Sequence, residues 1–526
     1  MRSGGRTECA ERAVSPVVGG VLVLAIVVTL AAVLLFMVYG LGGETDPTPQ
    51  AQLELTPDEA GSGYELRHLG GDAIGDGDGR VVVEGVANQS VLASKTLTAS
   101  TAVNVTPLAE TISILYYSDT GESYVVATFD AEPLPVTPDE GCEWVDDQTN
   151  GGTDDVTVDG IVVNCDVVTD GDVTVEDGGA VVGDVDGEEV TFDDGDVYGD
   201  VTADGEADFA NALVEGTVTS PQDVDLEDTE VTGPVDSGGD LTLDTGSSID
   251  GDAAGDEVDL TNSAIDGSVT ATEDVDLSDG EVTGDVDADD DVTLDSGSRI
   301  GGDLDGDEVS VDASTVEGSV DSTSSVDVSG STVQGSVTAD DDVTASGASL
   351  VGTVESDGDV TVDSSTSISG GIDGNQVGVA GSSVAGDVDA DSDASVSGAT
   401  VEGGVDSDGD VTVDSSTEIA GDVAGNEIGV SSSTVSGGVD GDSDVTVQSS
   451  TTVDGSVESA GDVGVSSSTV GGDVAGAGET TVDDATIGGD VFEGGSFSCS
   501  SSTIDGEDCG DYAPEDYDDY SIRRAR

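Results

Sequence analysis

The sequence predicts a mainly β protein, in which an apolar N-terminal helix and a small β domain precede a long β-solenoid. Three observations support this fold class. A short cassette recurs at nearly constant spacing over most of the 526 residues. Inside each repeat, apolar residues alternate with Asp, Ser and Thr, which is typical of strands. Long helix-favouring side chains are scarce, and Lys95 is the only lysine.

The repeated cassette is V-x-G-D/S/G-V, and it returns every 16 to 18 residues from about Val163 to Ile504. From Val181 to Ile504, nineteen steps give a mean spacing of 17 residues. A repeat this short cannot form its own core, so it is typical of a solenoid. About 20 coils stacked at ~4.8 Å would make a rod of about 95 Å.

A second strand-like phrase lies between copies of the cassette and reveals a longer period. Asp240-Leu-Thr-Leu-Asp244 recurs 51 residues later as Asp291-Val-Thr-Leu-Asp295. The same interval separates Asp359-Val-Thr-Val-Asp363 from Asp410-Val-Thr-Val-Asp414. Three coils therefore form one larger unit, which duplication explains.

Aromatic residues are absent between Phe209 and Phe492. We therefore expect a narrow interior that Val, Ile, Leu and Ala fill and that has no room for a ring. A disordered stalk is the alternative, because few aromatics and high charge are typical of disorder. The regular rhythm of apolar residues favours the solenoid.

The alternation V-x-G-D-V … D-V-T-V-D … V-x-G-D-V resembles the bactofilins, polymer-forming proteins with a right-handed β-helix. The resemblance covers roughly residues 156–506 and implies a right-handed solenoid, which we place at residues 156–509. It also implies coil ends that add to one another, since bactofilins polymerise end to end. This chain differs in its greater length and in its apolar N-terminal segment.

Residues 17–39 are uncharged and almost wholly apolar. At 1.5 Å per residue they would span roughly 35 Å, enough to cross a bilayer. Arg2, Arg6 and Arg12 precede this segment and Glu44 follows it. The positive flank predicts a single-pass membrane protein with a cytoplasmic N-terminus and an extracellular bulk. A secretory signal is the alternative, although the apolar run is long for one and no A-x-A site follows.

The boundary Glu11-Arg12-Ala13-Val14-Ser15-Pro16-Val17-Val18-Gly19 resembles the class III leader of archaeal type IV pilins. The resemblance implies that a prepilin peptidase removes residues 1–13 by cutting between Ala13 and Val14, next to Arg12. Residues 14–42 would then be the pilin helix, which either enters a pilus or stays in the membrane as an anchor.

The resemblance continues beyond the helix. Leu66–Ala73 and Ile112–Tyr117 resemble parts of the small β domain of pilin-like proteins, which we place at residues 43–132. Residues 133–155, which begin Pro-Leu-Pro-Val-Thr-Pro, are expected to form a stiff linker and an N-terminal cap.

Five cysteines occur, and Cys9 lies in the predicted leader. Cys142 and Cys165 flank the start of the solenoid, and Cys499 and Cys509 flank its end. An even number in an extracellular chain favours disulfides, and we predict these two pairs as locks on end caps. Caps would limit end-to-end addition, because open sheet edges invite pairing. A zinc site is the alternative, but the spacings match no common zinc pattern.

The formal net charge is −105, from 115 acidic and 10 basic residues. Such self-repulsion opposes a compact fold, and molar salt screens it by shortening the Debye length to about 3 Å. The composition therefore suggests a halophile. It also excludes nucleic acid as a partner, because the chain offers no basic patch.

Some β-helices are carbohydrate-active enzymes, which need acid–base residues held in a groove. Here His68 lies outside the predicted solenoid, Arg299 is the only base within it, and the Asp residues recur in every coil. No catalytic residue or cofactor is therefore assigned. Calcium is the remaining option, because Asp-rich corners resemble calcium β-rolls, but the nine-residue phase is not kept. The tail at 510–526 is acidic and is expected to be disordered.

These observations together predict a non-enzymatic, membrane-anchored surface protein that presents an acidic rod, as a minor pilus subunit, a spacer or an adhesin. Its partners would be the prepilin peptidase, the membrane, and either pilus subunits or other copies of itself. The second hypothesis is a bactofilin-like polymer scaffold. A calcium β-roll and a carbohydrate-active enzyme are the third and fourth.

Overall fold

The computed structural model describes residues 51–57, 64–74, 79–87, 92, 96–99, 101–118, 123–131, 133 and 141–524. The predicted leader and the apolar segment 17–39 lie outside these residues. Contacts divide the chain into two compact units, one composed mainly of residues up to Glu132 and one mainly of residues from Pro133 onward. No helix of the described part of the chain is long and apolar enough to cross a bilayer.

The first unit consists of two three-stranded sheets. One sheet has the order β1-β2-β4 and the other has the order β3-β5-β6. Their strands are β1 (Ala51–Pro57), β2 (Tyr64–Gly71), β3 (Gly79–Glu84), β4 (Ala102–Val105), β5 (Thr111–Ser118) and β6 (Ser123–Asp130). Leu66, Val83, Ile112 and Ile114 form the centre of its core and are fully buried.

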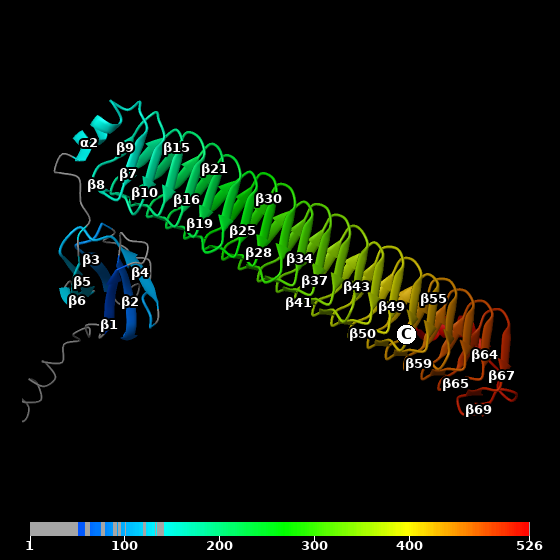
Figure 1. Ribbon diagram of the computed structural model, residues 1–526. Coiled ribbons are helices and arrows are strands. Elements are labelled where there is room, and N and C mark those ends of the chain that lie inside the picture. The colour runs from blue at the N-terminus through cyan, green and yellow to red at the C-terminus, as the bar shows by residue number, and fades with distance from the viewer. Residues whose placement is uncertain are drawn as a thin grey trace, which may run out of the picture. The chain divides into compact units, whose positions relative to one another are not determined.

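The second unit is a β-solenoid, which confirms the predicted fold class (Figure 1). The first coil has three strands: β7 (Val156–Asp159), β8 (Val162–Val163) and β9 (Val167–Val168). Each later coil repeats this order, so every third strand belongs to the same sheet. Sheet I runs from β7 to β67 (Phe497–Ser500) with twenty-one strands. Sheet II runs from β8 to β68 (Thr503–Ile504), and sheet III from β9 to β66 (Val491–Glu493).

Neighbouring coils pair in parallel, and like residues lie above like residues. Val292 pairs with Val309, and Val309 pairs with Val326. These valines point inward and are at most 1% exposed. β-branched side chains pack well on such a pleated surface, which explains why valine dominates the interior.

Glycine at one corner allows the coils to approach closely. A Cβ placed on Gly318 would lie 2.2 Å from the carbonyl oxygen of Gly302 in the preceding coil. The backbone there has ordinary φ, so the constraint is the close approach rather than the conformation. This position is the glycine of the V-x-G cassette.

The coils are not all equally long, yet the sheets keep their register. Val231 pairs with Ile249, eighteen positions later, and Ile249 pairs with Ile265, sixteen positions later. The extra residue sits at the corner between sheets I and II, where Gly246 adopts φ +92°. The longer coil is therefore absorbed in one corner, and the next coil restores the spacing.

One expectation about the interior is wrong. Phe192 and Phe209 both point inward, are at most 2% exposed and stack with ring centroids 5.1 Å apart and 13° between planes. They occupy adjacent coils, and their separation is close to the strand spacing of ~4.8 Å. Rings fit because two consecutive coils carry them and stack along the axis, and because Ala203 and Ala207 leave space beside them.

The C-terminal tail also differs from the expectation of disorder. Strands β69 (Glu507–Asp508) and β70 (Glu515–Asp516) and helix α3 (Tyr517–Arg524) follow β68. Tyrosines within the acidic segment supply apolar contacts that its composition hides. A second helix, α2 (Gly141–Gln148), precedes β7.

Candidate functional site

The N-terminal end of the solenoid is closed by α2. Val145 of this helix is 5% exposed and joins the core cluster of the solenoid, and Trp144 packs against the same cluster. The helix ends at Thr149, whose hydroxyl donates to the Val145 carbonyl at 2.8 Å. The inward residues Val156 and Val158 of the first coil are consequently as buried as those in the middle of the rod.

The C-terminal end is closed by the tail. β69 pairs antiparallel with β68, through Thr503 with Asp508 and Ile504 with Glu507, and so covers the edge of sheet II. β70 pairs parallel with β66 and covers the edge of sheet III. Both covering strands have two residues and both residues are acidic. Short, charged edge strands are poor templates for further pairing.

Tyr512 takes the place of a coil that is not there. In the preceding coils the N–H of Val457 donates to Asp473 O and that of Val474 to Asp490 O. Val491 belongs to the last coil, and its N–H donates to the Tyr512 hydroxyl oxygen at 2.7 Å. Burial raises the pKa of the Tyr512 phenol. The ring also packs edge-on against Phe497, with centroids 6.4 Å apart.

Helix α3 covers the outer face of sheet III near its end. Phe492 occupies an outward position at which the preceding coil has Ala475, yet it is fully buried. The Tyr520 ring lies 5.0 Å from the Phe492 ring. The Tyr520 hydroxyl donates to the Glu458 carboxylate two coils back. A phenylalanine on this face is thus explained by the helix that covers it.

Two disulfides join the caps to the rod. Cys142 of α2 is joined to Cys165 in the first coil, with Cα atoms 5.3 Å apart. Cys499 of β67 is joined to Cys509, which follows β69, with Cα atoms 5.9 Å apart. Each bond ties a cap to the coil that it covers.

Sheet I differs from the other two sheets at both ends. Among the described residues β7 pairs only with β10 (Val173–Glu176), and β67 pairs only with β64 (Thr480–Asp483). At β67 the inward residues Phe497 and Cys499 are only half-buried. The caps therefore cover the interior and two of three sheet edges.

The aspartates at the corners have a structural role that the sequence did not reveal. Asp285 Oδ1 accepts the N–H of Asp303 at 2.9 Å, and Asp303 Oδ1 accepts the N–H of Ser319 at 2.8 Å. Ser268 Oγ accepts the N–H of Asp285 at 3.3 Å in the same way. Because a serine hydroxyl serves at this position, the stack needs an acceptor and not a charge.

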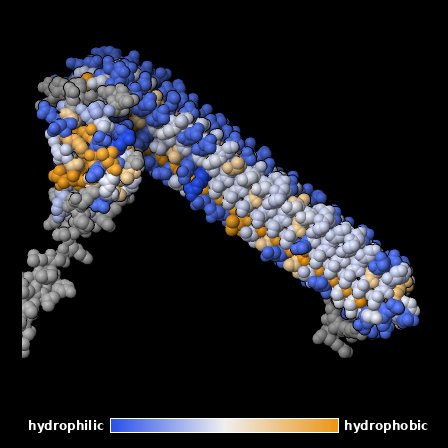
Figure 2. Space-filling view, turned by 60° about the horizontal axis from the view of Figure 1, so that its bottom comes forward, coloured by the Kyte–Doolittle hydropathy of each residue, from blue (hydrophilic) through white to orange (hydrophobic). Residues whose placement is uncertain are grey.

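The outward face of the solenoid is therefore far more acidic than its fold requires. Figure 2 shows a hydrophilic surface along the rod, with small and scattered apolar patches. Arg299 is the only base of the solenoid, and it pairs with Glu281 at 2.8 Å and with Glu317. His68 is 1% exposed in the first unit, where its Nε2 lies 2.8 Å from the Asp72 carbonyl oxygen.

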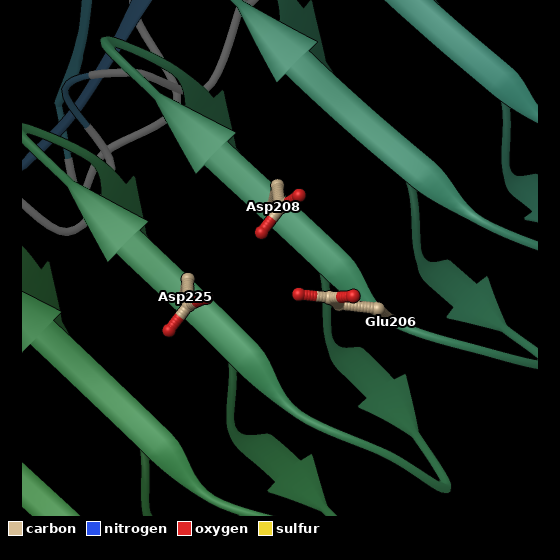
Figure 3. Close-up of side chains that lie close together, drawn as sticks. All are labelled: Glu206, Asp208 and Asp225. Carbon is tan, nitrogen blue, oxygen red and sulfur yellow. The ribbon is translucent and has the colours of Figure 1, made fainter.

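The densest acidic group lies near the N-terminal end of sheet I. Glu206 precedes β16 (Ala207–Ala210), which carries Asp208, and Asp225 lies on the neighbouring strand β19 (Val224–Glu227) (Figure 3). One carboxylate oxygen of each lies within 4.8 Å of the others. Burial and the charge of Asp225 raise the pKa of Asp208.

An equivalent group recurs 51 residues later as Glu257, Asp259 and Asp276. Burial, followed by the charge of Asp276, raises the pKa of Asp259. Calcium takes six to eight oxygens, so three carboxylates would provide only part of its shell. Acidic groups of this kind attract cations loosely, and the geometry assigns no calcium site.

Sequence reasoning missed the residues that close the C-terminal end. Tyr512, Tyr520 and Phe492 build that closure, whereas the sequence interpretation treated the tail as disordered. The signal was available, because aromatic residues reappear at position 492 after an interval of 282 residues without any. The predicted cleavage residues Arg12, Ala13 and Val14 lie outside the described residues.

Comparison with known families agrees with the two parts of the sequence. Residues 12–53 match the family described as "Archaeal Type IV pilin, N-terminal". Residues 260–350, in the middle of the solenoid, match the bactofilin family, described as "Polymer-forming cytoskeletal". The chain joins a pilin-type N-terminus to a bactofilin-type solenoid. The pilin match starts at Arg12 and includes the whole apolar run.

A protein of Archaeoglobus fulgidus described as uncharacterized is 34% identical over 124 residues, which are 23% of this chain and 85% of that protein. The chain belongs to the same family as that protein. Both matched family models describe structural proteins, so the chain is a structural protein of pilin-like or polymer-forming type.

Proposed function

We propose that this protein is anchored in the cell membrane by its pilin-type helix and presents the solenoid outside the cell as a rigid, acidic spacer. The closure of both solenoid ends carries this proposal. A rod of twenty-one coils at ~4.8 Å per coil is about 100 Å long. Closed ends suit a rod of fixed length, because end-to-end addition would have to displace α2 at one end and the tail at the other.

The second candidate is a polymer scaffold of the bactofilin type. It is favoured by one specific observation, the uncovered edges of sheet I at β7 and β67. A minor pilus subunit and an adhesive rod are variants of the first candidate, and they differ in what the N-terminal helix and the rod surface contact. No catalytic role is proposed.

Electron microscopy of the full chain, purified in detergent and molar salt, distinguishes the two candidates. The spacer predicts isolated rods near 100 Å by the coil spacing, both with and without reductant. Filaments in the untreated sample would contradict it. Filaments only after reduction would show that the disulfides Cys142–Cys165 and Cys499–Cys509 hold the caps that prevent polymerisation.

The membrane topology is tested by the leader. We propose that a prepilin peptidase cuts between Ala13 and Val14, which leaves the apolar helix at the new N-terminus. Ala13→Phe should block this cleavage, and Ala10→Phe is the matched control that should not. The length of the mature chain is read by mass spectrometry, and normal processing of Ala13→Phe would contradict the assignment.

We further propose that the acidic surface is an adaptation to high salt. The corner positions need only an acceptor, as Ser268 shows, so the carboxylates there add charge without adding a needed contact. Hydrated carboxylates keep a protein soluble in concentrated salt. Thermal unfolding should shift upward from 0.1 M to 2 M KCl, and a melting temperature independent of salt would contradict this.

A further inference from the structure

We infer that Asn104 is an N-glycosylation site, modified by an oligosaccharide from a lipid-linked donor before the first unit folds. The inference rests on the proposed extracellular location of this unit. Asn104-Val105-Thr106 has the Asn-x-Thr pattern, with a residue other than proline in the middle.

The strand that carries Asn104 leaves room for a glycan. In β4, Val103 and Val105 point into the core, and Asn104 is exposed between them. β4 is the last strand in the order β1-β2-β4, and Asn104 is paired across to Glu65 of β2. A glycan on this side chain would extend away from the core.

The hydroxyl of the pattern sets the time of modification. The transferase reads the Asn and the Thr hydroxyl together, but Thr106 is only 4% exposed in the folded unit. Its carbonyl also accepts the N–H of Ala87 at 2.9 Å, so the segment is held in place. The pattern is accessible only before folding, as the chain emerges from the membrane.

The reaction is a balanced group transfer. The Asn104 Nδ2 bonds to the anomeric carbon of the sugar, while the bond between that carbon and the lipid phosphate oxygen breaks. The electron pair of that bond leaves with the phosphate, and one amide proton passes to the released phosphate. No oxidant or reductant is needed.

The placement of asparagines separates the two units. Asn211 and Asn262 of the solenoid lie at corners with φ +51° and +49°, a conformation that asparagine tolerates. Neither these nor the other solenoid asparagines are followed by Ser or Thr at the second position. The glycan is therefore confined to the first unit and leaves the rod bare. It would also shield the β4 edge from pairing with other chains.

The test is mass spectrometry of the full chain purified from an archaeal host that glycosylates its surface proteins. Glutamyl endopeptidase releases residues 85–110, which contain Asn104 and a second pattern at Asn88, outside the described residues. Fragmentation then assigns the glycan to one asparagine. We expect a modified Asn104 in the wild type, in Asn88→Gln and in Thr106→Ser, and its loss in Asn104→Gln and Thr106→Val.

An unmodified Asn104 in the wild type, or a glycan retained in Thr106→Val, overturns the inference. The leader in the same sample shows whether the proposed function falls with it. If the chain starts at Val14 and Asn104 is bare, only the glycosylation is wrong. If the leader is still attached as well, the extracellular location is also wrong. Presenting unmodified, folded protein to the same membranes should give no transfer, and transfer there would refute the proposed timing.

Discussion

Replacing Tyr512 by Phe tests whether the tail completes the last coil. The substitution removes the oxygen that accepts the Val491 N–H at 2.7 Å and keeps the ring against Phe497. Val491 is fully buried, so its N–H is left without an acceptor. An unsatisfied buried donor costs about 1–3 kcal/mol, and each 1.4 kcal/mol is about tenfold in an equilibrium constant. Opening of this end should therefore become roughly 5- to 100-fold more frequent.

Hydrogen–deuterium exchange measures that opening. In Tyr512→Phe, peptides covering residues 491–500 should exchange faster by about this factor, while those in the middle of the rod should be unchanged. Tyr198→Phe is the matched control, because the Tyr198 hydroxyl donates only to a surface carboxylate, Asp196, at 3.1 Å. Exchange at residues 491–500 as slow as in the wild type would refute the argument that Tyr512 substitutes for a coil.

Three further predictions concern the rod itself. Asp303→Asn should leave exchange of the Ser319 amide unchanged, since the acceptor remains, whereas Asp303→Ala should speed it up about tenfold; equal rates in the two variants would contradict this. Gly318→Ala, which places a Cβ 2.2 Å from a carbonyl oxygen, should destabilise by about 1–3 kcal/mol in urea unfolding. Gly429→Ala, with no atom within 4 Å of its Cβ, should be neutral or mildly stabilising, and a similar loss in both would be the contrary result. The pKa of Asp208 is raised in the folded state, so the folded chain binds its proton more tightly, and stability at low salt should rise as pH falls from 7 toward 5; Asp208→Asn should reduce that rise in a thermal melt.

The sequence was sufficient for the solenoid because its fold depends on local periodicity. Valines such as Val292 and Val309 repeat at the coil length, so the stacked pairs could be predicted without a structure. The interior was harder to predict, since the fit of Phe192 and Phe209 depends on two rings in adjacent coils stacking on each other. A composition argument treats each ring alone and therefore excludes it.

The ends were the least predictable part of the rod. Their closure depends on contacts between distant segments, such as Tyr520 with Glu458, 62 positions apart. No local pattern encodes such a contact, and the acidic composition of residues 510–526 favoured disorder. The corner aspartates were also misread as turn and solvent residues, because their bonds to the next coil are visible only once the coils are stacked.

The compensation between long and short coils has a consequence for how this protein can change over generations. A 51-residue unit begins and ends in the same register, so recombination between units can add or remove one without disturbing either cap. Each event would alter the length by three coils, about 14 Å. The distance that the rod spans is thus inherited as a whole number of modules, and a lineage could adjust it in discrete increments while both termini stay the same.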